Sequence, residues 1–246
     1  MINIGIYGVC GKMGKRIAFL AFNDGNFAVK AAVERTEHPS LGKDLGGELA
    51  DGIKGINIVS DLDEVKDRID CMIDFTLPGP TMEHVSACLK RKIPMVIGTT
   101  GLDEEQEKKI REAAKIIPVV FSPNMAPGVN VLFDIVQRTA RSLGVDFSIK
   151  VDETHHVHKK DSPSGTAKMI AKVIKGACGK DVQVEASREG EVVGNHGIVF
   201  DNEFETLEIR HNAISRDVFA AGALKAAKFV SGKKAALYTM ADVLGL

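Results

Sequence analysis

Apolar and polar positions along the first half of the chain predict strands and helices in alternation. Residues Ile2 to Tyr7 form a β-branched apolar run typical of a strand, and the apolar residues from Ile17 to Ala21 recur at helical spacing. Further strands are predicted at 28–33, 56–59, 71–75, 94–97 and 119–121, with helices at 61–66, 81–90, from 103 onward, and at 129–143. Alternation of this kind is typical of a doubly wound parallel sheet, so the predicted fold class is α/β with a Rossmann-like dinucleotide-binding domain.

The second half of the chain has a different pattern. It predicts a strand at 146–151, a helix that starts at Pro163 to Thr166, three strand-like runs and a last helix. The runs lie at 182–186, 197–200 and 206–210, and the helix at 218–230. We expect an α+β substrate-binding domain with an open mixed sheet at 127–215, and a dinucleotide-binding domain formed by 1–126 with 216–246. The polar, glycine-rich stretch 36–55 predicts a loop or a short irregular helix over the cofactor.

A glycine turn joins the first strand to the first helix. Gly8 permits a tight turn, Gly11 lets the backbone approach a pyrophosphate, and Gly14 allows the helix to pack closely on the strand. Glu34 follows about 20 residues later, where a carboxylate would meet the ribose hydroxyls. Arg35 would instead suit a 2′-phosphate, so the sequence leaves NADH and NADPH both open.

Small polar turns follow three other predicted strands. They contain Thr76, the segment 98–100 and the segment 122–125. Ligands of open parallel sheets bind outside the carboxyl ends of the strands. We therefore expect these turns and the glycine turn to line one crevice.

The segment from Glu153 to Ala167, ETHHVHKKDSPSGTA, concentrates proton-transfer groups and positive charge. It contains three histidines and two lysines, and Asp161, Ser162 and Ser164 are the candidate caps for the turn before the helix that follows. The amino terminus of a helix attracts anions, so this segment predicts acid/base chemistry on a small acidic molecule, plausibly a carboxylate. The remaining histidines show no such pattern and are interpreted as surface or loop residues; they are His38, His84, His196 and His211.

Composition narrows the function classes. The chain has 246 residues, 44% of them hydrophobic, and a formal net charge of −1, which argues against a generally basic nucleic-acid surface. Its four cysteines lack C-x-x-C spacing, which favours a reducing cytoplasm over a disulfide framework. No run of uncharged apolar residues is long enough for a membrane span, and no export signal is expected.

Two other functions remain open from the residues alone. One is a zinc hydrolase with His155, His156 and His158 as ligands. The adjacent lysines repel a dication and we expect no acidic cluster nearby, so we predict no metal site. The other is a non-catalytic NAD(P)-sensing module, which would have no need of His155 and Lys159.

Three motifs resemble the dihydrodipicolinate reductase family: GVCGKMG near the start, VIGTTG at 96–101, and above all ETHHVHKKDSPSGTA, and the resemblance extends to the MADVLGL end. It implies NADH- or NADPH-dependent reduction of 4-hydroxy-tetrahydrodipicolinate to tetrahydrodipicolinate in the diaminopimelate pathway of lysine biosynthesis. It also implies a homo-oligomer, a tetramer, formed by the substrate-binding domain. One departure is a short segment before Ser187 to Gly190, where many members of the family have a longer excursion.

The resemblance also implies residue roles. His155 corresponds to the acid/base histidine and Lys159 to the proton-donating lysine. His156, Gly165 and Thr166 correspond to the substrate-carboxylate contacts. The implied nucleotide contacts are Gly8, Val9, Cys10, Gly11, Lys12, Met13, Glu34, Arg35, Gly98, Thr99, Thr100, Ser122, Pro123, Asn124 and Met125.

Overall fold

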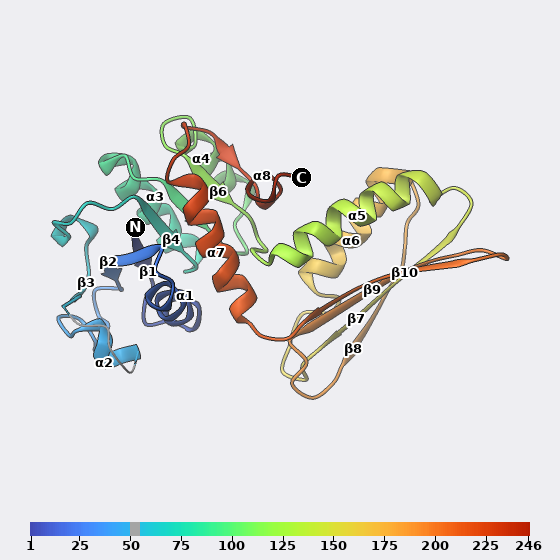
Figure 1. Cartoon of the computed structure of the whole chain (residues 1–246), viewed down its shortest axis with the longest axis horizontal. Coiled ribbons are helices and arrows are strands. Elements are labelled where there is room, and N and C mark those ends of the chain that lie inside the picture. Colours follow the sequence, from blue (N-terminus) through green and yellow to red (C-terminus); the bar gives the residue numbers. More distant parts are fainter. Residues whose placement is uncertain (50–54) are drawn as a thin grey trace. The chain divides into compact units, whose positions relative to one another are not determined.

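The computed structural model describes residues 1–49 and 55–246, and the chain divides into two compact units (Figure 1). Unit 1 contains Met1–Met125 and Phe219–Gly245, and unit 2 contains Ala126–Val218 together with Leu246. Within the stretch predicted as a loop or short helix, α2 covers Leu45–Leu49, and residues 50–54 lie outside the described part.

Unit 1 is built on a seven-stranded sheet in the order β11-β6-β5-β4-β1-β2-β3, with every pairing parallel. The strands are β1 (Ile2–Tyr7), β2 (Phe27–Val33), β3 (Ile58–Val59), β4 (Cys71–Asp74), β5 (Met95–Ile97), β6 (Val119–Phe121) and β11 (Leu237–Tyr238). After β3 the chain crosses to the other half of the sheet, so the strand order reverses between the neighbouring strands β1 and β4. Ligands bind at such a switch point in doubly wound sheets.

Helices cover both faces of this sheet (Figure 1). They are α1 (Lys12–Asn23), α3 (Pro78–Arg91), α4 (Glu104–Ala113), α7 (Asp217–Val230) and α8 (Met240–Leu244), with a 3₁₀ turn at Leu62–Glu64. One apolar core lies between the sheet and helices α1, α7 and α8. A second core lies between the opposite face and helices α3 and α4. The α/β prediction is therefore confirmed, and the predicted helix at 61–66 is shorter than expected.

Unit 2 combines two helices with a four-stranded mixed sheet in the order β10-β9-β7-β8. Its elements are α5 (Pro127–Leu143), β7 (Ser148–His155), α6 (Gly165–Cys178), β8 (Val184–Arg188), β9 (Gly194–Asp201) and β10 (Thr206–Ala213). Strand β8 pairs parallel to β7, whereas the other pairs are antiparallel. Helices α5 and α6 share one apolar core with the sheet.

Strand β7 extends four residues beyond the predicted end at Val151. The prediction was too short because the inward positions after Val151 carry titratable side chains in place of apolar ones. Val151, Glu153 and His155 are buried, whereas Asp152 and Thr154 between them are half-buried. This is the alternation of a strand with one covered face. The histidine segment therefore begins inside the sheet.

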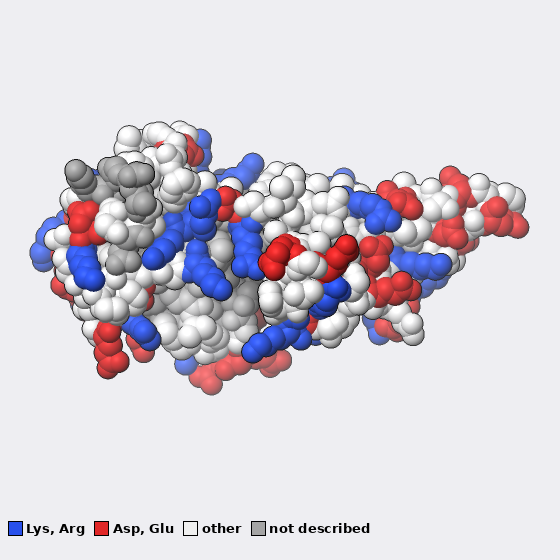
Figure 2. Space-filling model, turned by 90° about the horizontal axis from the view of Figure 1, so that it is seen from below, with Lys and Arg blue, Asp and Glu red and all other residues white. Residues whose placement is uncertain are grey.

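The surface carries both signs of charge. Basic and acidic side chains are present on each unit in the face drawn in Figure 2, as expected for a chain with a net charge of −1. Among the helices of the described residues, none has the length and apolar character that a bilayer crossing requires.

Candidate active site

The glycine turn after β1 fits a dinucleotide phosphate. Gly8 has φ +64, in the left-handed region that favours glycine. A Cβ at Gly14 would lie 2.2 Å from the Gly8 carbonyl oxygen, so α1 approaches β1 as closely as only glycine allows. Within the described residues no side chain caps the start of α1 at Gly11, and the first turn of this helix has no acidic residue. This helix terminus can therefore accept an anion.

Glu34 lies beside this turn at the end of β2. Its carboxylate accepts hydrogen bonds from the Cys10 N–H at 3.0 Å and from the Arg35 N–H at 3.1 Å. Together with Gly8, Glu34 and Arg35 line a cavity of about 530 Å³ in unit 1. The structure thus brings three of the predicted nucleotide residues to one cavity.

Sequence analysis missed other residues of this cavity. Tyr7 and His84 stack with ring centroids 3.7 Å apart, and His84 Nδ1 lies 2.7 Å from Oδ2 of the fully buried Asp74. Burial, reinforced by the Cys88 thiol, raises the pKa of Tyr7. The interpretation of His84 as a surface or loop residue is wrong, because it is tied to the end of β4 from helix α3.

The other predicted turns follow β4, β5 and β6, which are neighbours in the sheet. Hydroxyl groups link two of these turns, because Thr81 bonds to Thr76 at 3.3 Å and to Thr99 at 2.8 Å. In the third turn, the Ser122 hydroxyl donates to the Asn124 carbonyl at 2.8 Å. The strand order therefore brings the three turns to one edge.

The predicted nucleotide residues differ in what their side chains can contact. Val9 and Met125 are buried in the core of unit 1, so only their backbone could contact a ligand. Thr100 and Pro123 are exposed. Any contact that Val9 or Met125 makes with a nucleotide would thus not depend on the chemistry of its side chain.

In unit 2, a buried carboxylate organises the histidine segment. Glu153 is 1% exposed; its Oε2 contacts His155 Nδ1 at hydrogen-bonding distance, and its Oε1 accepts from the Ser164 N–H at 3.0 Å. Arg188 Nη1 also donates to Oε1 at 3.2 Å, and Arg188 Nη2 donates to the Asp161 carbonyl at 2.6 Å. Glu153 and Arg188 therefore join β7, β8 and the loop before α6.

Sequence analysis gave neither Glu153 nor Arg188 a role. The parallel register of β7 and β8 places Arg188 opposite His155. That register depends on long-range pairing, and no local pattern indicates it.

The electrostatics of this group favour an ionised carboxylate beside a neutral imidazole. Burial alone would raise the pKa of Glu153, but the Ser164 N–H, His155 and Arg188 together lower it. Burial lowers the pKa of His155, and Lys159 and Arg188 lower it further against the opposing effect of Glu153. Since Glu153 accepts the proton on Nδ1, the Nε2 atom of His155 is the one available for proton transfer.

Lys159 and the predicted carboxylate contacts lie in the loop that follows. Lys159 Nζ pairs with Asp161 Oδ1 at 2.8 Å, and its side chain is 22% exposed. His156 Nε2 lies 3.1 Å from Arg216 Nη2, a cation that sequence analysis missed. Gly165 and Thr166 begin α6, and Ser164 is confirmed as its cap because its hydroxyl accepts from the Ala167 N–H at 3.2 Å.

Two more histidines differ from their interpretation as surface or loop residues. His196 is 5% exposed in β9, and neither of its ring nitrogens has a hydrogen-bond partner among the described residues. Its ring lies 5.3 Å from that of His155 and 6.0 Å from that of His211, which is in β10. Burial, with His155 and His211, lowers the pKa of His196 to about 4. Both residues are therefore part of the sheet behind His155.

The structure also bears on the zinc hydrolase alternative. The histidines have one buried carboxylate beside them, since Glu153, His155 and His196 hold ligand atoms within 4.8 Å of one another. Among the described residues, His155, His156 and His158 do not form a metal-ligand group, and the exposed His158 lies 3.5 Å from Glu191. Arg188 on the Glu153 carboxylate opposes a dication at this group.

Comparison with known proteins identifies the family. Residues 2–125 match the family model described as dihydrodipicolinate reductase, N-terminus, and residues 128–244 match the one described as dihydrodipicolinate reductase, C-terminus. The 4-hydroxy-tetrahydrodipicolinate reductases of Trichlorobacter lovleyi and Geobacter metallireducens are 39% and 38% identical, over 100% of this chain and of each relative.

A solved structure supports the fold. The dipicolinate-bound dihydrodipicolinate reductase of Paenisporosarcina sp. TG-14 is similar with a TM-score of 0.81 and 24% identity, over 97% of both chains. The architecture of two units thus agrees with what the sequence matches indicate. From its motifs and from its length-wide similarity to these reductases, the chain belongs to the dihydrodipicolinate reductase family.

Proposed function

We propose that the chain catalyses the reduction of 4-hydroxy-tetrahydrodipicolinate to tetrahydrodipicolinate by NADH or NADPH, a step of the diaminopimelate pathway of lysine biosynthesis. The observation that carries this proposal is the buried Glu153–His155 pair. His155 is directly followed in the sequence by the first predicted carboxylate contact, His156, and Glu153 also accepts a hydrogen bond from the cap residue of α6. The reaction consumes one proton and one reduced nicotinamide and releases water and the oxidised nicotinamide.

The nucleotide is proposed to bind unit 1. The close approach at Gly14 and the uncapped start of α1 suit a pyrophosphate, and Glu34 suits a ribose. When bound, NADH or NADPH supplies a hydride to an electron-poor ring carbon of the substrate. Because Arg35 lines the same cavity as Glu34, we keep both nucleotides as candidates.

The proton is proposed to come from unit 2. Hydride addition leaves an electron pair on the conjugated ring system, and a nearby acid must neutralise it. Lys159 is the proposed donor. After Lys159 has given its proton to the substrate, His155 is proposed to take up one proton from solvent at Nε2 and pass it to Lys159, and Glu153 stabilises the imidazolium that carries it.

The substrate carboxylates are proposed to bind at the start of α6. The backbone of Gly165 and Thr166 lies at the positive end of the helix dipole. The first turn of α6 has no acidic residue to oppose an anion. His156 accepts a hydrogen bond from the cationic Arg216, and we propose that these two side chains also contact the substrate. A dicarboxylate would therefore bind with the reacting ring near His155.

A steady-state assay tests the proposal directly. The substrate is the freshly made product of dihydrodipicolinate synthase, and oxidation of NADH and of NADPH is followed by nicotinamide absorbance. We expect turnover with at least one nucleotide. Nucleotide binding without oxidation would support the sensing module instead.

A single substitution tests the assigned proton donor. Lys159→Met is expected to lose most turnover and keep nucleotide binding, since unit 1 is unchanged. Lys172→Met, which changes an exposed lysine of α6, is the matched control and is expected to keep turnover. Activity of Lys159→Met near that of the unsubstituted chain would refute the role of Lys159.

We further propose the assembly and location of the enzyme. Residues 1–126 with 216–246 would bind the dinucleotide, and 127–215 would bind substrate and form a homotetramer. The family resemblance supports the tetramer, and light scattering of the purified chain tests it. A reducing compartment such as the cytoplasm is supported by the four cysteines, all within described segments and none in a disulfide.

A further inference from the structure

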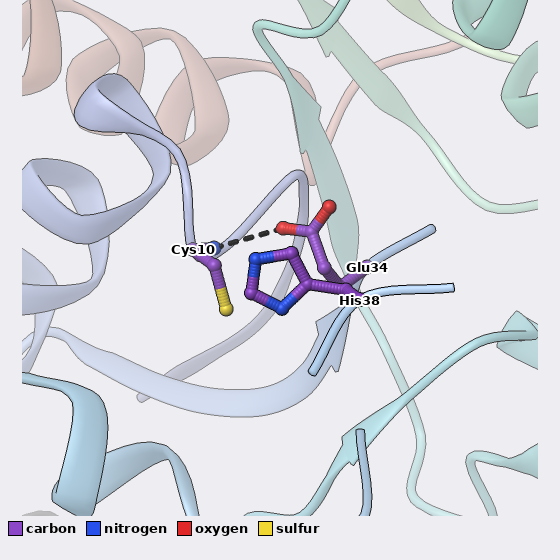
Figure 3. A group of neighbouring side chains, drawn as sticks. All are labelled: Cys10, Glu34 and His38. Atoms are coloured by element: carbon purple, nitrogen blue, oxygen red, sulfur yellow. Dashed lines mark hydrogen bonds between the residues drawn. The ribbon is translucent and has the colours of Figure 1, made fainter. Parts of the chain in front are cut away.

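A second group of ligand-type side chains lies in unit 1, outside the acid/base site. Cys10 Sγ, a carboxylate oxygen of Glu34 and a ring nitrogen of His38 all lie within 4.8 Å of one another (Figure 3). They come from two segments, the turn after β1 and the chain just beyond β2. We propose that these three residues bind a borderline-soft divalent cation such as Zn²⁺, and that the bound ion excludes the nucleotide.

The donor set favours that class of ion. Thiolate, imidazole and carboxylate are each ligands that zinc accepts, and a zinc site with three protein ligands keeps one position open. Zinc bond lengths of about 2.0–2.3 Å place tetrahedral ligand atoms about 3.5 Å apart, so the side chains would need to close by about 1 Å. All three residues are half-buried, and because Cys10 packs against the core of unit 1, we expect the side chains of Glu34 and His38 to make most of that movement.

Neighbouring hydrogen bonds already orient two of the ligands. His38 Nδ1 accepts the Ser40 N–H at 3.2 Å, which leaves Nε2 as the ring nitrogen for a metal. The Glu34 carboxylate is held toward the turn by the Cys10 N–H, the bond drawn dashed in Figure 3. Hydrogen bonds of this kind fix the tautomer and direction of metal ligands.

Position in the fold links the ion to the nucleotide. Glu34 is the proposed ribose contact and Cys10 belongs to the proposed phosphate turn, so an ion held by both would occupy the nucleotide's place. This second part of the proposal rests on the proposed function. The first part, binding of the ion by the three residues, does not depend on the proposed function.

Cobalt binding tests the site without any nucleotide. Untagged protein freed of metal with a chelator is titrated with Co²⁺, which gives visible bands in a tetrahedral site and a near-ultraviolet charge-transfer band when a thiolate is bound. We expect both signals to saturate at one ion per chain and to disappear when Zn²⁺ is added. Absence of these signals, or saturation at several ions without a thiolate band, would overturn the site.

Three variants identify the ligands. Cys10→Ser is expected to lose the charge-transfer band, and His38→Ala to weaken Co²⁺ binding at least about tenfold, the lower end of what even an outer-shell partner contributes. Cys178→Ser is the matched control, because Cys178 lies in unit 2, and should leave both signals unchanged. A band that survives in Cys10→Ser, or unchanged affinity in His38→Ala, would contradict the assignment.

Competition tests the link to the nucleotide. The apparent Kd of NADH, followed by nicotinamide fluorescence, should rise with Zn²⁺ concentration in the unsubstituted chain and stay constant in His38→Ala. An NADH affinity that Zn²⁺ leaves unchanged would overturn the exclusion. A chain that binds Co²⁺ as expected but binds neither nucleotide would instead refute the proposed function and leave the ion site standing.

Discussion

Glu153 is the residue whose change tests the unit 2 site most sharply. Glu153→Gln keeps the shape of a side chain that is 1% exposed and removes its charge. The carboxylate accepts from His155, Ser164 and Arg188 at once. An amide has one acceptor oxygen in place of two, so at least one of these donors would face an NH₂ group.

The size of the effect follows from the hydrogen bonds. Bonds to charged groups contribute about 1.5–3 kcal/mol and neutral bonds about 0.5–1.5 kcal/mol, so the substitution weakens stabilisation of a charged His155 by about 1–2 kcal/mol. At about 1.4 kcal/mol for each tenfold change, turnover should fall about 5- to 30-fold. One buried donor left unpaired would also lower the free energy of unfolding by about 1–3 kcal/mol.

The pH profile separates a positioning role from loss of folding. Glu153 raises the pKa of His155 against the effect of burial. Without the charge, that pKa falls further, so the limb of the kcat profile that follows the ionisation of His155 should shift to lower pH. NADH binding to unit 1 should be unchanged. Asp152→Asn, on the other face of β7, is the control and should keep both kcat and the profile.

Two outcomes would refute this reasoning. A Glu153→Gln protein that unfolds at its normal denaturant concentration and keeps both kcat and pH profile would show that the carboxylate does not act on His155. An unchanged profile with a reduced kcat would place its effect in loop structure alone.

Three further predictions concern two positions in unit 2 and one in unit 1. Gly194→Ala should lower turnover at least about tenfold, because a Cβ there would lie 2.8 Å from His155 Nε2; Gly176→Ala, with open space around it, is the kinetic control. The free energy of unfolding, measured in urea, should fall by about 3 kcal/mol as pH falls from 6.5 to about 4, because His196 takes up a proton in the unfolded chain before it does so in the folded chain. A His196→Leu chain whose free energy of unfolding falls equally over this pH range would contradict this. Gly14→Ala should lower the free energy of unfolding by at least about 1–3 kcal/mol in the same assay, because its Cβ would lie 2.2 Å from a backbone oxygen; unchanged stability would refute the close approach.

The sequence predicted unit 1 well because its signals are local. Apolar runs of the parallel strands lie between glycine or polar turns, and the glycine spacing indicates a turn whose shape depends on neighbouring residues. The cavity beside Glu34 was only partly predicted. Tyr7 and His84 meet there because β1 and β4 are neighbours, and a crossover of that kind leaves no mark in either segment.

Unit 2 was harder to predict because its buried face carries titratable groups. Glu153, His155 and His196 occupy inward positions where hydrophobic periodicity expects apolar residues. The strand therefore seemed to end at Val151. Motif resemblance indicated His155 and Lys159. Glu153 became evident as the partner of His155 only once β7 was seen to continue to His155, and Arg188 only from the register of β7 and β8.

One carboxylate connects the two tasks of unit 2. Oε2 of Glu153 orients the imidazole that is proposed to handle the proton, and Oε1 holds the backbone of Ser164, where the proposed carboxylate-binding helix begins. A rotation of this side chain would therefore move the proton site and the anion site together. Because Arg188 fixes the same oxygen, such a rotation must break an ion pair whose carboxylate is fully buried. The two sites are thus held in one fixed relation before any substrate arrives, which is the preorganisation that proton transfer to a bound dicarboxylate requires.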